Sequence, residues 1–290
     1  MRAVAIFAPQ VSPRLLLPFE QVLGPIEVVD EIAPGLAADA ALIFGGDGTL
    51  HRHLAGLAAT QIPLLAVPAG SANDFAWNLG LRTLDAALAA WRKFAAGAAN
   101  LRSVDLGVIE SASEPPAPPI HFCCVAGCGL DAEANRRANA MPRWLRAHGG
   151  YKLAALLTIL LHRSQTVTVT AGAAAPGQPE RRLSRPARLV AFGNASTYGG
   201  GMRIAPAARL DDGLLDLCFV SHLGRLRLLR FFPTVMSGRH IEMPEVEYLP
   251  TPILRVETEP PLEVYADGEP AGRTPIVVRA LPRALRVLLP

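Results

Sequence analysis

The sequence predicts an α/β domain followed by a mainly β domain, with the boundary near residue 102. Through the first hundred residues, short apolar runs alternate with segments whose apolar residues recur every three or four positions, the pattern of a parallel α/β layer. Beyond Leu101, strand-like runs follow one another with only two helical patterns between them. Half of the 290 residues are hydrophobic and 18% are charged, so the chain can bury the cores of two modest domains.

The first domain is expected to contain three strands, each too short and too continuously apolar to be a surface helix: Ala3–Phe7, Ala40–Phe44 and Ile62–Val67. Helical spacing follows the second strand, in Leu50, Leu54, Leu57 and Ala58. A further helix is predicted from Leu84 to Phe94, with Thr83 placed to cap its start and Gly97 to end it.

The second domain begins with a predicted hairpin, in which the proline-rich loop Ser111–Pro119 separates Val104–Ile109 from His121–Val125. Ala171–Arg182 is polar and contains proline, which indicates a surface loop. We therefore expect a first domain over residues 1–101, to which residues 280–290 return, and a second over residues 102–279. The remaining predicted strands are Thr166–Thr170, Ala187–Phe192, Leu214–Val220, Leu262–Tyr265 and Ile276–Arg279, and the predicted helices are Trp144–Leu161 and Leu223–Ser237.

Composition limits the classes of function. A formal net charge of +3 is small for this length and does not favour a nucleic-acid partner, although it would not hinder approach to an anionic membrane surface. The longest apolar helical stretch, Leu153–Leu161, is far shorter than a membrane span. The four cysteines have neither CxxC spacing nor a disulfide framework, so we expect reduced, buried thiols in a cytoplasmic protein. The sequence leaves a homodimer open.

The segment Gly45-Gly46-Asp47-Gly48-Thr49 is a candidate phosphate-binding turn, because it joins an apolar strand to a helix. That geometry presents backbone N–H groups at a helix N-terminus, and glycines permit close approach of the backbone. Asp47 would act through Mg²⁺ or a water, and Thr49 could cap the helix or donate to a phosphate. Taken alone, the segment is equally compatible with an ordinary tight turn.

A second segment, Pro68–Phe75, also follows a strand and opens a helix. Gly70 and Ser71 supply further donors, and Asn73 and Asp74 could cap the helix start. Because both turns would lie at the carboxyl ends of parallel strands, where open α/β sheets bind ligands, they are expected to form one site.

These two segments resemble the GGDGT and P-x-G-[ST]-x-N-D-F signatures of the diacylglycerol kinase catalytic domain, which is found in bacterial lipid kinases and in sphingosine and ceramide kinases. The resemblance covers nearly the whole chain. It continues through Val104–Gly107, Gly127–Asp131, Asn194–Gly201, Leu210–Leu217 and Asp267–Pro270. It implies an NAD kinase/diacylglycerol kinase-like nucleotide-binding domain, a C-terminal β-sandwich and a cleft between them.

The resemblance also implies a reaction, the transfer of the γ-phosphoryl group of ATP to a hydroxyl of a diacylglycerol-like lipid at a membrane surface, so the protein would be peripheral at the inner membrane. Such a transfer needs a phosphate cradle, Mg²⁺ and a base. Carried over residue by residue, the base would be Asp267, with Glu269 beside it. A structural Mg²⁺ would bind Asp212 and the carbonyl oxygens of Arg209 and Leu214. ATP would be held by Gly45, Gly46, Asp47, Gly48, Thr49, Gly70, Ser71 and Asn73.

The chain departs from the family pattern on the nucleotide side. His51-Arg52 stands where an Asn-Glu pair is typical, and the first strand runs into Ala8-Pro9-Gln10 instead of an Asn-Pro-x-x-Gly contact. Two alternatives therefore stay open beside a lipid kinase: a kinase of this fold acting on a non-lipid acceptor such as NAD or a polyol, and a non-catalytic homologue that binds nucleotide or lipid. The helix around Leu153–Leu161 could contact lipid, although such apolar faces more often pack in a core.

Overall fold

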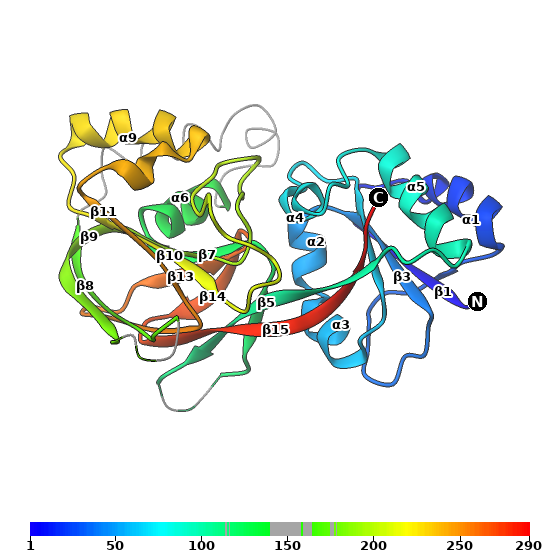
Figure 1. Ribbon diagram of the computed structural model, residues 1–290, viewed down its shortest axis with the longest axis horizontal. Helices are drawn as coiled ribbons and strands as arrows, with labels where there is room; N and C mark the ends of the chain where they lie inside the picture. Colours follow the sequence, from blue (N-terminus) through cyan, green and yellow to red (C-terminus); the bar gives the residue numbers. More distant parts are fainter. Residues whose placement is uncertain (114, 116, 140–157, 159–163, 175–176, 178) are drawn as a thin grey trace.

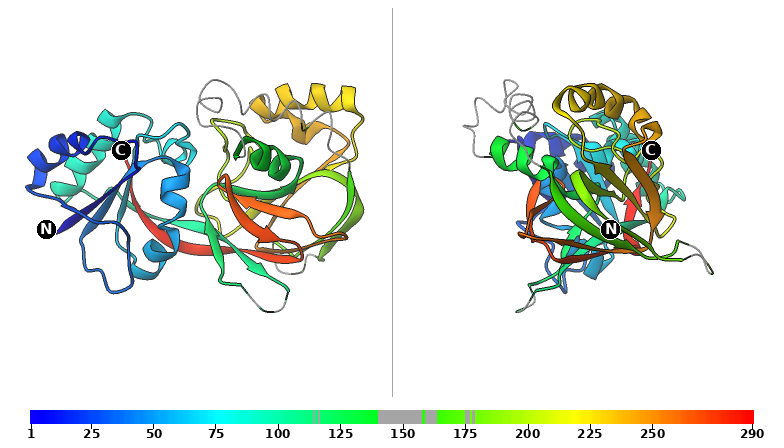
Figure 2. Two further views of the ribbon diagram at one scale, coloured as in Figure 1. Left: turned by 180° about the vertical axis from the view of Figure 1, so that it is seen from behind. Right: turned by 90° about the vertical axis from the view of Figure 1, so that its left-hand side faces the viewer.

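The computed structural model describes residues 1–290 except 114, 116, 140–157, 159–163, 175–176 and 178. It consists of an N-terminal α/β half and a C-terminal β half, and two long strands run from one half into the other (Figures 1 and 2). The predicted helix Trp144–Leu161 lies outside the described residues apart from Thr158, which is fully buried.

The N-terminal half is built on a parallel sheet in the order β2-β1-β3-β4, which comprises Glu27–Val28, Ala3–Phe7, Ala40–Gly45 and Leu64–Pro68. Helices α1 (Leu17–Leu23) and α5 (Leu84–Ala95) pack against each other, and α3 (Leu54–Thr60) lies on the other face of the sheet (Figure 1). Two short helices, α2 (Asp47–His51) and α4 (Asp74–Asn78), follow β3 and β4 on the side that faces the C-terminal half. A 3-10 turn, Pro13–Leu16, precedes α1.

The amphipathic helix α5 forms as its sequence predicts. The Thr83 hydroxyl accepts a hydrogen bond from the Ala86 amide at 3.1 Å, which caps the first turn. Trp91 is fully buried and donates its indole N–H to the Phe19 carbonyl at 3.1 Å, which ties α5 to α1. The helical pattern after residue 49 forms two helices instead of one, with Arg52 and His53 in a turn between them.

Strands β5 (Leu101–Ser111) and β15 (Ile276–Leu288) pair antiparallel along nearly their whole lengths. At its far end β15 joins the N-terminal sheet, where Val287 pairs in parallel with Leu64 of β4. Nearer its start, β15 pairs with β12 of the C-terminal half. These two strands, here called the β5–β15 ribbon, therefore belong to both halves and carry the chain between them.

The remaining strands form the C-terminal half, in which β7 and β8 both pair with the long strand β9, and β9 also pairs with β10. Its apolar core includes Phe122, Phe192, Phe219 and Leu254. Helix α6 (Leu130–Asn139) follows β7, and α9 (Arg225–Ser237) and the 3-10 turn Arg239–Glu242 follow β10. The strands are β6 Ile120–Phe122, β7 Val125–Gly129, β8 Gln165–Ala171, β9 Arg181–Gly193, β10 Leu215–Ser221, β11 Val246–Thr251, β12 Ile253–Thr258, β13 Glu263–Ala266 and β14 Glu269–Arg273.

Two features differ from the sequence predictions. Strands β2, β11, β12 and β14 were not predicted, and the end of the predicted loop Ala171–Arg182 belongs to β9, which starts at Arg181. The predicted β5–β6 hairpin is confirmed, with Val108 opposite His121.

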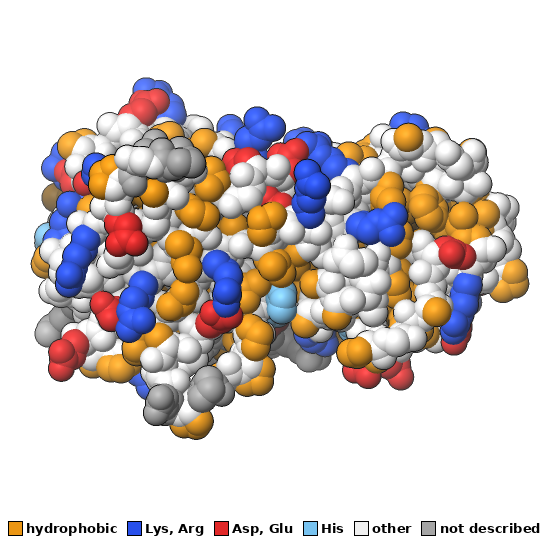
Figure 3. All heavy atoms as spheres, turned by 60° about the horizontal axis from the view of Figure 1, so that its bottom comes forward, with side chains coloured by type: hydrophobic (Ala, Val, Ile, Leu, Met, Phe, Trp, Pro, Cys, Tyr) orange, Lys and Arg blue, Asp and Glu red, His pale blue; other side chains and the backbone are white. Residues whose placement is uncertain are grey.

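Basic side chains do not collect in a single field on the face shown in Figure 3, where Lys and Arg lie among Asp and Glu. Two adjacent arginines of α6, Arg136 and Arg137, form ion pairs with Glu133 on the same helix, with N–O distances of 2.7 and 2.8 Å. These pairs lower the pKa of the Glu133 carboxyl.

Candidate active site

The two glycine turns lie against each other at one edge of the parallel sheet. Gly45 at the end of β3 pairs with Pro68 at the end of β4, and the Ala69 amide donates to the Gly45 carbonyl at 3.1 Å. A Cβ atom at Gly46 would lie 2.3 Å from the Ala72 carbonyl oxygen, and one at Gly70 would lie 2.4 Å from the Gly46 Cα. Both positions therefore require glycine because backbone packs directly on backbone.

Within the two turns, the predicted phosphate ligands have different surroundings. Asn73 stabilises its own turn, since its Oδ1 accepts from the Gly70 amide and its Nδ2 donates to the Gly70 carbonyl, both at 2.9 Å. Thr49 is buried against Gly45, whereas Ser71 is exposed. Gly48 is the second residue of α2, where helix geometry leaves the amide without an intrahelical partner.

Asp47 caps the helix that follows the other turn. Its two carboxylate oxygens accept hydrogen bonds from the amides of Asp74 and Phe75, at 2.9 and 3.0 Å, at the start of α4. The sequence suggested Asn73 and Asp74 for that cap, but Asn73 makes no capping bond. Burial, together with the nearby Asp267 and Asp74 charges, raises the pKa of Asp47 to about 6, against the lowering effect of the hydrogen bonds from the Phe75 and Asp74 amides. The metal role of Asp47 stays a prediction. It is compatible with these hydrogen bonds, because each carboxylate oxygen keeps a second lone pair that can bind an ion.

Asp74 fixes a third glycine segment. Its side chain is fully buried and accepts hydrogen bonds from the amides of Gly200 and Gly201 at 2.7 and 2.8 Å. Asn78, one turn later on α4, bonds to the hydroxyls of Ser196 and Thr197, both at 2.8 Å. Helix α4 thus anchors the Asn194–Gly201 segment of the C-terminal half beside the two turns.

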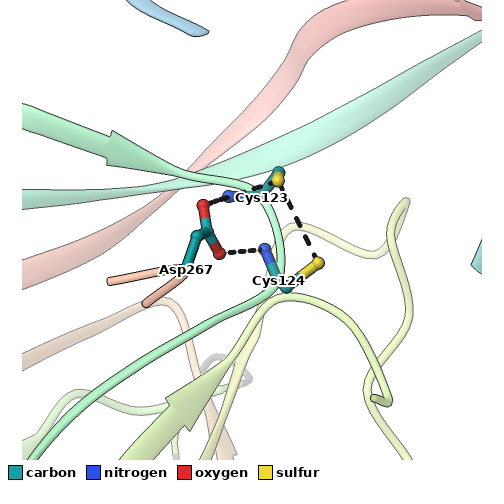
Figure 4. Close-up of side chains that lie close together, drawn as sticks. All are labelled: Cys123, Cys124 and Asp267. Atoms are coloured by element: carbon teal, nitrogen blue, oxygen red, sulfur yellow. Dashed lines mark hydrogen bonds between the residues drawn. The ribbon is translucent and has the colours of Figure 1, made fainter. Parts of the chain in front are cut away.

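Asp267 lies at the β13–β14 hairpin, where its φ of 49° and the φ of 88° at Gly268 suit the left-handed residues of a tight turn. Its carboxylate turns inward, and its side chain has no exposed surface. The amides of Cys123 and Cys124 each donate to it at 2.9 Å (Figure 4). The amide of Val125 donates to it at 3.3 Å. Three backbone donors therefore fix the carboxylate in one orientation.

Helix α2 meets both acidic residues of the hairpin. His51, the last residue of α2, places Nδ1 3.2 Å from Oδ2 of Asp267. At the start of α2, a Cβ on Gly48 would lie only 3.1 Å from Oε1 of Glu269. The GGDGT turn and its helix thus face Asp267 and Glu269, as the resemblance predicts for residues that share one site.

Two histidines form a second part of this site. His121 on β6 has a buried Nδ1 atom that lacks a hydrogen-bond partner among the described residues. Burial lowers the pKa of His121, and the neighbouring His51 lowers it further. Sequence reasoning noted His51 only as a departure from the family pattern and missed His121, because neither residue belongs to a motif.

The predicted structural Mg²⁺ site lies on the loop before β10. Asp212 accepts a hydrogen bond from the Leu214 amide at 3.1 Å, and Arg209 pairs with Asp211 at 3.5 Å. Burial raises the pKa of Asp212, and the negative charge of the buried Asp105 raises it further. A cation there would relieve this repulsion, so the carboxylates fit a hard ion such as Mg²⁺.

Asp105 also joins this loop to the β5–β15 ribbon, because it accepts from the amides of Gly213 and Arg283, both at 2.7 Å. Its own amide donates to the Leu210 carbonyl at 2.7 Å. The Val104–Gly107 motif therefore has a structural role, because its Asp105 joins the loop to the ribbon. This gives a reason for one of the segments in which the chain resembles the family.

Comparison with known proteins gives two family matches. The diacylglycerol kinase catalytic domain matches residues 22–109, and the YegS C-terminal NAD kinase beta sandwich-like domain matches residues 124–289. A diacylglycerol kinase of Mycobacterium tuberculosis is 36% identical over 258 residues, which covers 87% of this chain and 77% of that protein.

Solved structures agree on the fold. A Bacillus anthracis diacylglycerol kinase structure has a TM-score of 0.67 at 18% identity, covering 100% of this chain and 97% of that one. An Archaeoglobus fulgidus NAD kinase in complex with ATP has a TM-score of 0.53 at 13% identity, covering 99% of this chain and 93% of that one.

The α/β half, the β-sandwich half and the paired glycine turns define a kinase fold shared by NAD kinases and diacylglycerol kinases. Within that class, the chain belongs to the diacylglycerol kinase family.

Proposed function

We propose that the protein is an ATP-dependent lipid kinase, which transfers the γ-phosphoryl group to a hydroxyl of a diacylglycerol-like acceptor. The observation that carries the proposal is the approach of the β13–β14 hairpin to helix α2, which brings the Asp267 carboxylate to the end of the GGDGT helix through His51. A phosphate cradle and a proton-accepting pair then lie in one site, as phosphoryl transfer requires.

In this proposal the phosphates of ATP bind at the glycine turns. Gly48 at the start of α2 and the exposed Ser71 supply the donors, and the close backbone contact of Gly46 with Gly70 fixes the two turns relative to each other. Mg²⁺ would neutralise phosphate charge. Asp47 and Glu269 offer carboxylate oxygens at that position, which suit the ion chemically.

The proton of the acceptor hydroxyl goes to the His51–Asp267 pair. Asp267 has no exposed side-chain surface, whereas the His51 side chain is 11% exposed and stands next to it. With the proton on Nδ1 of His51 directed at Asp267, Nε2 is the basic atom, and the buried carboxylate stabilises the imidazolium that forms. Asp267 then acts through His51, which refines its expected role as the direct base.

Approach to the lipid is proposed to use helix α9, which has opposed apolar faces. Leu228, Phe231 and Val235 are buried, while Leu226, Leu229 and Met236 are 81%, 41% and 55% exposed. Arg230 is also exposed on this helix. Exposed leucines beside a cation are suited to the surface of an anionic bilayer. None of the described helices is long and apolar enough to cross a membrane.

The acceptor is tested with [γ-³²P]ATP and a panel of diacylglycerol, phosphatidylglycerol, sphingosine, ceramide and NAD. We expect label in a lipid product. Label in NAD alone would replace the lipid assignment with that of a NAD kinase, and nucleotide binding without transfer to any acceptor would indicate a non-catalytic homologue.

The membrane surface is tested separately by sedimentation with phosphatidylglycerol-containing and pure phosphatidylcholine vesicles. Leu226→Asp is expected to reduce the bound fraction on the anionic vesicles, whereas Val28→Asp, at an apolar residue of the N-terminal half that is 56% exposed, serves as the control. Equal loss in both variants would remove α9 from the proposal.

A further inference from the structure

Cys123 and Cys124 place two thiols beside the Asp267 carboxylate. The two Sγ atoms are 4.0 Å apart, and the Cys123 Sγ lies 3.5 Å from Oδ2 of Asp267. Among the described residues, these three form a group in which one sulfur or oxygen atom of each lies within 4.8 Å of the others. Figure 4 shows that the amides of the two adjacent cysteines point at the carboxylate of Asp267. It also shows both sulfur atoms on this same segment of chain.

We propose that Cys123, Cys124 and Asp267 form a binding site for a thiophilic divalent cation of the zinc and cadmium class, and that the bound ion inhibits the enzyme. In a tetrahedral zinc site, with Zn–S of about 2.3 Å and Zn–O of about 2.0 Å, two sulfurs lie about 3.8 Å apart and a sulfur and an oxygen about 3.5 Å apart. The observed separations of 4.0 Å between the two sulfurs and 3.5 Å between the Cys123 sulfur and Oδ2 are close to these values, and the Cys124 sulfur lies within 4.8 Å of a carboxylate oxygen.

Binding of the ion in place of two protons leaves the net charge of the buried cluster unchanged. A cysteine side chain at neutral pH is ordinarily a thiol, so each of the two ligands carries one proton before the ion binds. As the ion binds, two S–H bonds break, two metal–sulfur bonds form, and two protons leave to solvent. A charge of +2 replaces two protons, so the cluster keeps its net charge and no additional buried charge is created.

His51 gives the site its open side. Its Nδ1 lies 3.2 Å from the Asp267 oxygen that faces Cys123, and its side chain is partly exposed, unlike those of the three ligands. An ion on Oδ2 displaces the hydrogen bond from His51, and the imidazole becomes available as a fourth ligand. The inhibition therefore rests on the proposed role of the His51–Asp267 pair, whereas binding of the ion does not.

The site is tested by titrating the reduced, metal-free full chain with Cd²⁺ and following the ultraviolet thiolate-to-cadmium charge-transfer band. In parallel, Zn²⁺ inhibition is measured at fixed Mg·ATP, with each variant normalised to its own metal-free rate. Cys123→Ala and Cys124→Ala remove one ligand each, and serine versions serve if an alanine variant misfolds. The matched controls are Cys128→Ala and Cys218→Ala, because these thiols are equally buried but lie outside the cluster.

We expect the wild-type chain and both controls to bind one Cd²⁺ with the same band. Cys123→Ala and Cys124→Ala should lose the band and need at least about tenfold more Zn²⁺ for half inhibition, since metal affinity falls by at least that factor when a supporting group is lost. A full band in either cluster variant, or none in the wild type, would overturn the site.

The cadmium titration and the zinc inhibition assay also test the metal site separately from the proposed function. Zn²⁺ inhibition that is equal in all variants would place the inhibitory ion elsewhere and overturn the inhibitory role. A chain that transfers no phosphate but shows the cysteine-dependent band would retain the metal site and lose only the proposed function.

Discussion

His51 and Asp267 are 216 positions apart in the chain, yet Nδ1 of the imidazole lies 3.2 Å from Oδ2 of the carboxylate. One residue ends the helix of the GGDGT turn, and the other begins the hairpin turn of the C-terminal half. Their contact joins the candidate phosphate site to the candidate proton acceptor, so it is the first relationship to test.

Replacing His51 with alanine should lower kcat by about 10²- to 10⁴-fold, the usual contribution of a general base. Added imidazole should restore part of the rate, with substituted imidazoles more effective as their basicity rises. His53→Ala is the control, because His53 lies two residues away and, in the described part of the chain, forms no hydrogen bond or ion pair with Asp267. Loss of rate without imidazole rescue would show that His51 only supports the fold.

Asp47→Ala should destabilise the protein by about 1–2 kcal/mol, because it removes the cap from two amides of α4. Urea unfolding measures this loss, and Asp47→Asn should lose less because one amide oxygen still accepts. Nucleotide affinity, measured by calorimetry with Mg·ATP, should fall in both variants if the carboxylate also contributes to the metal. A fall with Asp47→Ala alone would assign the effect to the displaced helix.

Gly46→Ala should prevent the two turns from packing, since its Cβ would lie 2.3 Å from the Ala72 carbonyl oxygen. We expect a loss of several kcal/mol, of the order of other severe backbone clashes, and a lower thermal midpoint. Gly224→Ala is the matched control, because a Cβ there meets nothing within 4 Å. Similar midpoints for the two variants would contradict the close contact of the turns.

Stability should depend on pH through Asp216, a buried residue of β10. Burial raises its pKa to about 6 from an ordinary value of 3.8, and Tyr248 donates a hydrogen bond that opposes the shift. The folded state therefore binds more protons than the unfolded state between these values. The contribution of Asp216 is greatest below pH 3.8, declines as the pH rises towards about 6, and is constant above that.

Urea unfolding of the wild type and Asp216→Asn across this range measures the effect. The difference between their unfolding free energies should change by at most about 1.4 kcal/mol per pH unit. Asparagine keeps an acceptor for the Tyr248 hydroxyl, so the packing is retained. A difference that is independent of pH would show that Asp216 titrates normally.

The α/β half could be predicted because its strands are continuous apolar runs and its helices have regular spacing. Ala3–Phe7 and the helix at Trp91 form as expected. Strands β11 and β12 escaped prediction because their apolar pattern is weak. In β12, Ile253 is 43% exposed, and in β11 only the two terminal residues are buried. Their pairing depends on neighbouring strands from distant parts of the chain.

The candidate site could be predicted at the level of its motifs but not of its contacts. The glycine turns and Asp267 were identifiable, because turn residues and the family resemblance mark them. The cap that Asp47 provides for α4 and the amides that hold Asp267 are tertiary contacts between backbone and side chain. No residue type in the sequence predicts such contacts, since every non-proline backbone amide can make them.

The β5–β15 ribbon also has a consequence for synthesis of the protein. Val287 pairs with Leu64, and the Leu289 amide donates to the Asn100 carbonyl at 2.9 Å. The N-terminal sheet therefore acquires its last strand only after residue 288 has left the ribosome. Until then this edge of β4 is unpaired. During synthesis this edge therefore stays available for pairing with other strands until the segment around Val287 has emerged.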